Sequence, residues 1–132
     1  SPSGASGELL RLVEAGIITM VVSEEVITES DRVLAAKFPE LIQESRKLWK
    51  DLEPVVVPNP TTAQLKLFIE KLPRGDASIL CAAHLSKPSV FVTWNTRDFM
   101  RPGIAALVGF PIVVPADALK LFRDWIDPYL GQ

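Results

Sequence analysis

The sequence has little of several residues that define specialised protein classes. It has one cysteine, Cys81, and one histidine, His84, so an internal disulfide is impossible and a zinc site is not indicated. A lone thiol in an apolar helical run is typical of a buried core cysteine in a reducing compartment, and we expect a cytoplasmic protein. No apolar run approaches the roughly 18 residues of a membrane-spanning helix, and no export signal is recognised, so neither membrane nor secretion is expected.

The sequence also lacks an excess of charge of one sign. Its 14 Lys and Arg residues nearly balance 16 Asp and Glu residues, which gives a net charge of -2. Whole-chain attraction to nucleic acid is therefore not predicted, although a local basic rim remains possible. The 132 residues suit one domain with one core, and no repeat, low-complexity tract or linker indicates a second domain.

Short apolar runs alternate with helical patterns along the chain. Four runs have the length and composition of strands: 17–22, 55–57, 89–93 and 112–114. Between them, apolar residues recur at helical spacing, with Ser23 as a predicted N-cap and Thr61 with Gln64 as a predicted capping box. Continuous apolar strands separated by helices predict an α/β protein with one parallel four-stranded sheet and helices on both faces, a three-layer arrangement.

Polar side chains gather where the predicted strands end and helices begin. They are Glu24, Glu25, Glu29, Asp76, Asn95 and Asp98. In an open parallel sheet, functional groups collect at the carboxyl ends of the strands, so we expect these residues to converge. Clustered carboxylates raise one another's pKa unless a cation is present. Oxygen ligands suit Mg²⁺ or Mn²⁺, which can polarise a phosphodiester and activate a water molecule.

Each of these residues also has a structural interpretation. Asp76 could be only an N-cap, a role that stabilises a helix by about 1 kcal/mol. Glu29 could lie in solvent, and Asn95 and Asp98 could only form the turn after a strand. Trp94 lies close to this cluster in the sequence, and we expect it to be a packing or interface residue rather than a platform on which bases stack. Four nearby basic residues could hold phosphates, although scattered surface bases are common: Lys71, Arg74, Arg97 and Arg101.

Two segments carry a resemblance to a known family. Residues 75–99, "GDASILCAAHLSKPSVFVTWNTRDF", and residues 21–40, "VVSEEVITESDRVLAAKFPE", resemble the PIN-domain family of metal-dependent nucleases, which includes toxins of prokaryotic toxin–antitoxin pairs. The resemblance extends over nearly the whole chain. It implies an endoribonuclease that acts on RNA, a possible antitoxin partner and a homodimer. It also implies that three acids hold Mg²⁺ or Mn²⁺, with two polar neighbours that tune water and ligand geometry: Glu29, Asp76 and Asp98, with Thr93 and Asn95.

The chain departs from the family pattern at its start. PIN domains usually begin with an apolar strand that ends in Asp-x-Asn and lies in the middle of the sheet. This sequence begins with "SPSGASG", which resembles the loop after that strand. The expectation is an N-terminally truncated domain, residues 1–132, with four strands, weak metal binding and little or no cleavage. Either a neighbouring molecule fills the place of the strand or the remaining strands close up, because unpaired central backbone is costly to bury.

Two other functions remain open from the sequence. A non-catalytic PIN-like module that binds RNA or protein would fit the missing acid and the small net charge. A receiver-like signalling domain also uses clustered acids and Mg²⁺. It needs a strand that ends in a phosphoacceptor aspartate and a later lysine after a strand, and no predicted strand here ends in that way.

Overall fold

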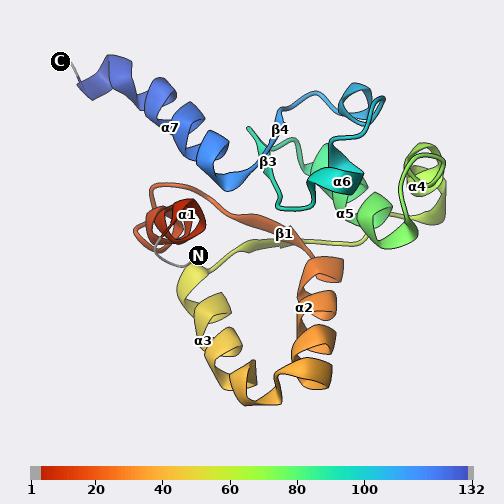
Figure 1. Cartoon of the computed structure of the whole chain (residues 1–132), viewed down its shortest axis with the longest axis horizontal. Helices are drawn as coiled ribbons and strands as arrows, with labels where there is room; N and C mark the ends of the chain where they lie inside the picture. Colours follow the sequence, from red (N-terminus) through yellow and green to blue (C-terminus); the bar gives the residue numbers. More distant parts are fainter. Residues whose placement is uncertain (1–3, 131–132) are drawn as a thin grey trace.

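The computed structural model describes residues 4–130 and shows a mixed α/β protein that is mostly helical (Figure 1). The predicted alternation of helices with short strands is confirmed. Within residues 4–130, no helix is both long and apolar enough to span a membrane. The elements, in chain order and with 3-10 turns written η, are α1 (Ala5–Glu14), β1 (Val21–Ser23), α2 (Glu24–Lys37), η1 (Pro39–Leu41), α3 (Ile42–Leu52), β2 (Val55–Val57), α4 (Thr62–Ile69), α5 (Arg74–Ser86), β3 (Phe91–Val92), α6 (Thr96–Phe99), η2 (Ala105–Leu107), β4 (Ile112–Val113) and α7 (Pro115–Leu130).

The strands form two separate parallel sheets instead of the single four-stranded sheet that the sequence predicted. β1 pairs with β2, with Val21 opposite Val55, and β3 pairs with β4, with Phe91 opposite Ile112. Each strand has only two or three residues, although the apolar runs are longer. Joining such short strands edge to edge would add few hydrogen bonds, each with a net contribution of about 1 kcal/mol. The prediction of one sheet is therefore wrong for residues 4–130.

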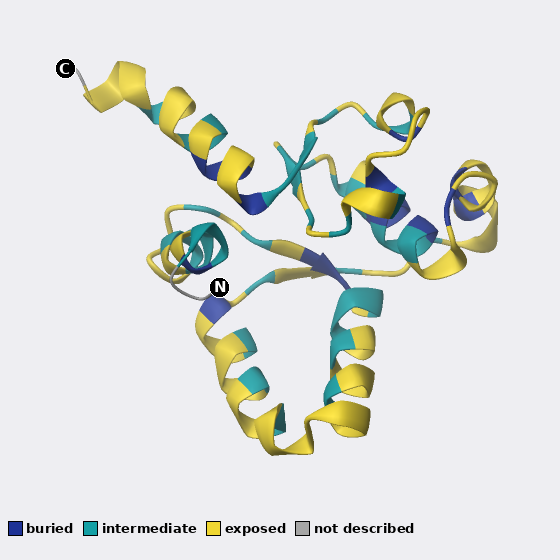
Figure 2. Cartoon of the chain, in the orientation of Figure 1, coloured by how far each residue is buried: buried dark blue, intermediate teal, exposed yellow. Residues whose placement is uncertain are grey.

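The short strands leave apolar side chains at the surface. Val55 and Val56 of β2 are about half exposed, and Val21 of β1 and Val92 of β3 are also exposed. In Figure 2 the β1–β2 sheet is largely coloured as exposed, with burial confined to the end of β1. Helices therefore do not cover both faces of this sheet.

The main core lies around α4, α5 and the segment that follows β3. Its buried members are Leu65, Phe68, Leu72, Ala77, Leu80, Cys81, Phe99 and Ile104. Helix α5 supplies three of them at helical spacing, which turns one face of α5 inward. The thiol of Cys81 donates to the Gln64 carbonyl oxygen at 3.4 Å, and burial raises the pKa of this thiol. The predicted core position of Cys81 is confirmed.

Local sequence signals fix where two helices begin. The Ser23 hydroxyl accepts from the Val26 N–H and starts α2, as predicted. Thr61 and Gln64 form the predicted capping box at the start of α4, with each side chain accepting from the other residue's N–H. These contacts satisfy backbone donors that the first helical turn leaves open. Both helix starts are thus set by residues a few positions apart.

Two parts of the chain extend away from this core (Figure 1). Helices α2 and α3 form a hairpin in which no α2 residue is buried and Leu52 is the buried residue of α3. Helix α7 packs its first turns against α1, while Trp125 and Tyr129 nearer its end are exposed. Of the opening segment "SPSGASG", which was expected to be a loop, residues 1–3 lie outside the described residues and Ala5–Gly7 belong to α1.

Candidate functional site

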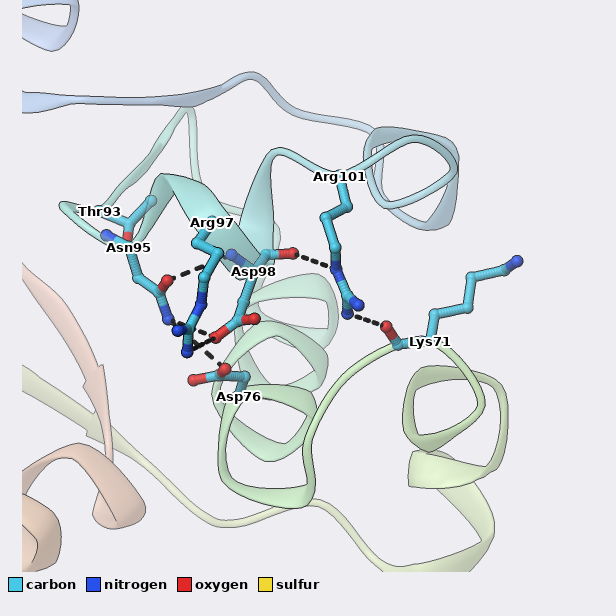
Figure 3. A network of polar contacts seen from close by, with 7 residues as sticks. All are labelled: Lys71, Asp76, Thr93, Asn95, Arg97, Asp98 and Arg101. Atoms are coloured by element: carbon cyan, nitrogen blue, oxygen red, sulfur yellow. Dashed lines mark hydrogen bonds and ion pairs between the residues drawn. The ribbon is translucent and has the colours of Figure 1, made fainter.

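Three of the predicted polar residues meet between α5 and α6. Asp76 comes from the first turn of α5, and Asn95 and Asp98 come from the turn after β3 (Figure 3). The Asn95 amide nitrogen, Nδ2, donates to Asp98 Oδ2 at 3.1 Å and lies 3.5 Å from Asp76 Oδ2. One amide group therefore bridges two carboxyl groups that are 22 positions apart in the sequence.

The local turn explains how Asn95 is held in place. Asn95 Oδ1 accepts from the Asp98 N–H at 3.2 Å and caps the short helix α6. Thr93 Oγ1 accepts from the Asn95 N–H at 2.9 Å. Because Asn95 Oδ1 faces the backbone, its nitrogen is the atom that faces the carboxyl groups. Asn95 thus forms a turn and also positions Asp76 and Asp98.

Asp76 is not an N-cap. Helix α5 begins at Arg74 after Pro73, and no side chain caps it. Asp76 therefore lies inside the first turn, with its carboxyl group directed toward Asn95 and Asp98 (Figure 3). The structural interpretation of Asp76 as only a capping residue is wrong.

The two carboxyl groups have opposite tendencies to hold a proton. Burial raises the pKa of Asp76, and the neighbouring Asp98 carboxylate raises it further. The hydrogen bond from Asn95 lowers the pKa of Asp98, with a further contribution from its hydrogen bond with Asp76 and from Arg97 and Arg101. Asp76 is thus the partner that retains a proton as the pH rises. The Asp98 side chain is only 14% exposed, so water screens this interaction incompletely.

Two arginines approach the carboxyl pair in different ways. Arg97 Nη2 lies 3.7 Å from Asp98 Oδ2, but the Arg97 side chain is almost fully exposed, so this ion pair is weak. Arg101 instead donates to the backbone carbonyl oxygens of Asp98 and Lys71. Arg101 therefore ties α6 to the α4–α5 connection, whereas the exposed Arg97 side chain reaches toward the carboxyl pair (Figure 3).

Glu29 lies apart from this pair. It is on α2, where its Oε2 is 2.7 Å from Arg32 Nη2. Among residues 4–130, no three Asp, Glu, His or Cys side chains lie close enough to hold one metal ion. The structure therefore brings together Asp76 and Asp98 but not the third predicted ligand, Glu29, which pairs with Arg32 on its own helix.

Two further glutamates at the start of α2 differ in their contacts. Glu24 Oε1 accepts from the Asn59 N–H at 3.1 Å, and the Glu25 N–H donates to Asn59 Oδ1 at 2.9 Å. This reciprocal pair fixes the start of α2 against the loop after β2. In this pair Glu24 uses its side-chain carboxylate, whereas Glu25 uses only its backbone N–H.

The Asp76–Asp98 pair suits a small divalent cation. Mg²⁺ is usually bound through one or two carboxylates together with water and substrate phosphates, rather than by a full protein cage. Both side chains offer only oxygen ligands, and the neighbouring carboxyl groups are already close enough to share a donor. A bound cation would compete with protonation of Asp76, since a proton and a cation both reduce the repulsion between the two carboxylates.

The sequence did not predict a pocket that lies on the other side of the first turn of α5. Its volume is about 400 Å³. The lining comes from α2, the loop after β2, α4 and α5, namely Glu25, Glu29, Arg32, Asn59, Pro60, Leu65, Arg74, Gly75 and Ser78. Three of these lining residues had been singled out in the sequence, Glu25 and Glu29 among the acids and Arg74 among the flanking bases, but nothing in the sequence placed them together.

Of the two roles predicted for Trp94, packing or an interface, its exposure excludes packing in the core. Its side chain is 67% exposed, and its indole Nε1–H donates to Ser6 Oγ at 3.1 Å. The ring therefore lies beside the Asn95 turn as an accessible surface, and it is not part of the core.

The chain was compared with protein-family models, with curated proteins and with solved structures, and none of them matches it. The residues themselves therefore carry any functional assignment.

Proposed function

We propose that this chain is a PIN-like, Mg²⁺- or Mn²⁺-dependent phosphodiesterase that cleaves RNA, with the two small sheets and their helices as a reduced form of the three-layer PIN fold. The observation that supports this proposal most strongly is the bridging of Asp76 and Asp98 by Asn95 next to the end of β3. A purely structural role does not require two carboxyl groups in contact, because such a pair repels itself at neutral pH.

In this proposal Asp76 and Asp98 hold the cation, and Asn95 and Thr93 fix the geometry of the two carboxylates. When bound, the cation supplies polarisation of the phosphate and an activated water molecule. Arg97 is free to approach a phosphate, since its side chain is almost fully exposed. The exposed ring of Trp94 supports RNA as the substrate because bases of single strands stack on accessible aromatic rings. We expect slow cleavage, because only two carboxylates meet among the described residues.

Glu29 stays a predicted third ligand. Its carboxylate would have to leave Arg32 to join the other two, which makes its contribution conditional on a movement of α2 or of the side chain. Replacement by glutamine tests this role directly.

An antitoxin partner, a homodimer and a cytoplasmic location belong to the same proposal. The exposed apolar side chains of the α2–α3 hairpin, which include Phe38, Leu41 and Leu48, offer one surface for protein association. The free thiol of Cys81 supports a reducing compartment. Light scattering of the purified chain measures its assembly state.

The experiment that tests the proposed activity is RNA cleavage in the presence of Mn²⁺. Wild-type protein should cleave a single-stranded RNA, EDTA should stop the reaction, and Asp98→Asn should reduce the rate by at least about 100-fold. Asp31→Asn is the matched control, because Asp31 is exposed on α2 and has no ion pair with another described residue. Cleavage that persists in Asp98→Asn would contradict the proposal.

A second candidate function is a PIN-like module that binds RNA or protein without catalysis. The arrangement of the acids favours it, since Glu29 lies apart from Asp76 and Asp98. This alternative predicts RNA affinity that is insensitive to Asp98→Asn and no cleavage with either cation.

A further inference from the structure

The pocket between α2 and α5 is lined by four charged side chains, two of which have no polar partner among residues 4–130. Glu29 and Arg32 pair with each other across 2.7 Å. Glu25 and Arg74 also line the pocket, and neither side chain forms an ion pair or a hydrogen bond with another residue in the range 4–130. The pocket therefore presents one free carboxylate from α2 and one free guanidinium from α5.

The remaining surface of the pocket is partly apolar. Pro60 and the buried Leu65 supply apolar wall, and the volume of about 400 Å³ lies within the range of small-ligand sites. A group that fits must offer hydrogen-bond donors to Glu25, an apolar face to Leu65 and a negative charge to Arg74. A nucleotide has all three features.

The free carboxylate discriminates among the four bases. A carboxylate only accepts hydrogen bonds, and its two oxygens match two adjacent donors. Guanine presents such a pair, N1–H and the N2 amino group, on its Watson–Crick edge, which is accessible in single-stranded RNA. Uracil places one donor between two carbonyl oxygens, which a carboxylate repels. Adenine and cytosine each place one amino donor beside an acceptor nitrogen.

We propose that this pocket binds a guanine base of single-stranded RNA, with the Glu25 carboxylate on its Watson–Crick edge and Arg74 on an adjacent phosphate. The inference rests on the proposed function. The guanine would belong to a nucleotide next to the phosphate that lies at the Asp76–Asp98 site. It makes Glu25 a specificity-determining residue that has no part in holding the cation.

The two sites are connected through the first turn of α5. Arg74 and Ser78 face the pocket, and Asp76 faces α6. The backbone of a helical turn is only about 5 Å wide. Gly75 lies between Arg74 and Asp76 in the sequence, and apart from its chain neighbours and the nearby backbone of its own helix, no described atom lies within 4 Å of the place where a Cβ would stand. The surface at Gly75 is therefore open to an approaching RNA backbone.

The experiment measures affinity without cleavage. Fluorescence anisotropy in EDTA compares short single-stranded RNAs of the same sequence that carry guanine, inosine or uracil at one position. We expect the guanine RNA to bind about tenfold more tightly than the uracil RNA, with inosine between them, because inosine lacks the N2 amino group. Glu25→Gln should remove most of this preference, and Glu44→Gln, an exposed glutamate on α3, should leave it unchanged.

Arg74→Ala provides a second variant with a different signature. It should weaken binding of all three RNAs by a similar factor, because a phosphate contact carries no base information. Circular dichroism of each variant checks that the fold is retained.

The outcomes separate this inference from the proposed function. Equal affinity for all three RNAs, or a guanine preference that survives Glu25→Gln, overturns the pocket assignment even if Mn²⁺-dependent cleavage is observed. A guanine preference that depends on Glu25 without any cleavage supports the pocket and contradicts the nuclease. Absence of RNA binding in EDTA overturns the pocket assignment, whereas the nuclease is judged separately by the cleavage assay with Mn²⁺.

Discussion

The carboxyl groups of Asp76 and Asp98 share a single hydrogen-bond donor, Nδ2 of Asn95, at 3.5 and 3.1 Å. This contact joins the first turn of α5 to α6 and makes the protonation of Asp76 dependent on the charge of Asp98. Consequences for pH, stability and metal binding follow from this one relationship.

The first prediction concerns stability and pH. The pKa of Asp76 is raised in the folded state, so protonation of Asp76 stabilises the fold. This stabilisation is lost as the pH rises through the raised pKa. Asp76→Asn mimics the protonated side chain. It should therefore increase the melting temperature at pH 7 relative to wild type and have a smaller effect at pH 3, where Asp76 is protonated in both states. Thermal denaturation at the two pH values measures the difference.

The control for this experiment is Asp31→Asn, which should show no such dependence on pH. A lower melting temperature for Asp76→Asn at pH 7 would show that the Asp76 carboxylate makes a favourable contact in the folded protein.

The second prediction concerns Asn95. Asn95→Ala removes the cap of α6 and the donor between the two carboxyl groups, and should lower the free energy of unfolding by about 1–2 kcal/mol at pH 7. Asn95→Ser keeps a capping oxygen and should cost less. Urea denaturation measures both values. Equal stability of Asn95→Ala and wild type would mean that the bridge has no net effect.

The third prediction concerns cation binding. Mn²⁺ should raise the melting temperature of the wild type at pH 7 in a concentration-dependent manner, because a ligand that binds only the folded state stabilises it. The effect should shrink at pH 4, where the proton on Asp76 competes with the ion. Asp98→Asn should weaken Mn²⁺ binding by about tenfold or more.

Glu29→Gln distinguishes two versions of this site. Unchanged Mn²⁺ affinity would confine the site to Asp76 and Asp98, and a similar loss to that of Asp98→Asn would establish Glu29 as a third ligand. A melting temperature that does not respond to Mn²⁺ in the wild type would contradict the metal site.

The fourth prediction concerns the core. Leu80 is 0% exposed within the α4–α5 cluster, and Leu80→Ala should lower the free energy of unfolding by about 2–5 kcal/mol. Leu67 on α4 is 65% exposed, so Leu67→Ala is a matched control with an effect below about 0.5 kcal/mol. Similar losses for the two variants would mean that the core is not centred on α5.

The sequence was informative where a few neighbouring residues decide the outcome. The cap at Ser23, the box of Thr61 and Gln64 and the burial of Cys81 depend on helical spacing and local hydrogen bonds, and all three were predicted. The meeting of Asp76 with Asp98 was expected at one edge of a single sheet. The two residues do meet, but that sheet is absent from residues 4–130, and Asp76 lies on a helix that follows α4 and not a strand.

The failures have a common physical origin. Whether β1 pairs with β3 depends on contacts between distant segments, which strand propensity does not specify. The direction of Glu29 depends on competition between Arg32, one turn away, and a site on another helix. The pocket exists only once α2 and α5 are placed side by side, so no single segment carries its pattern.

The half-exposed valines of β2 favour self-association of the protein at high concentration. Apolar strands with an open edge attract other extended chains, so self-association should compete with the folded monomer. Val55→Thr and Val56→Thr would keep the β-branched shape and make the surface of β2 more polar. The substitutions would reduce self-association and leave the packing around Leu80 unchanged.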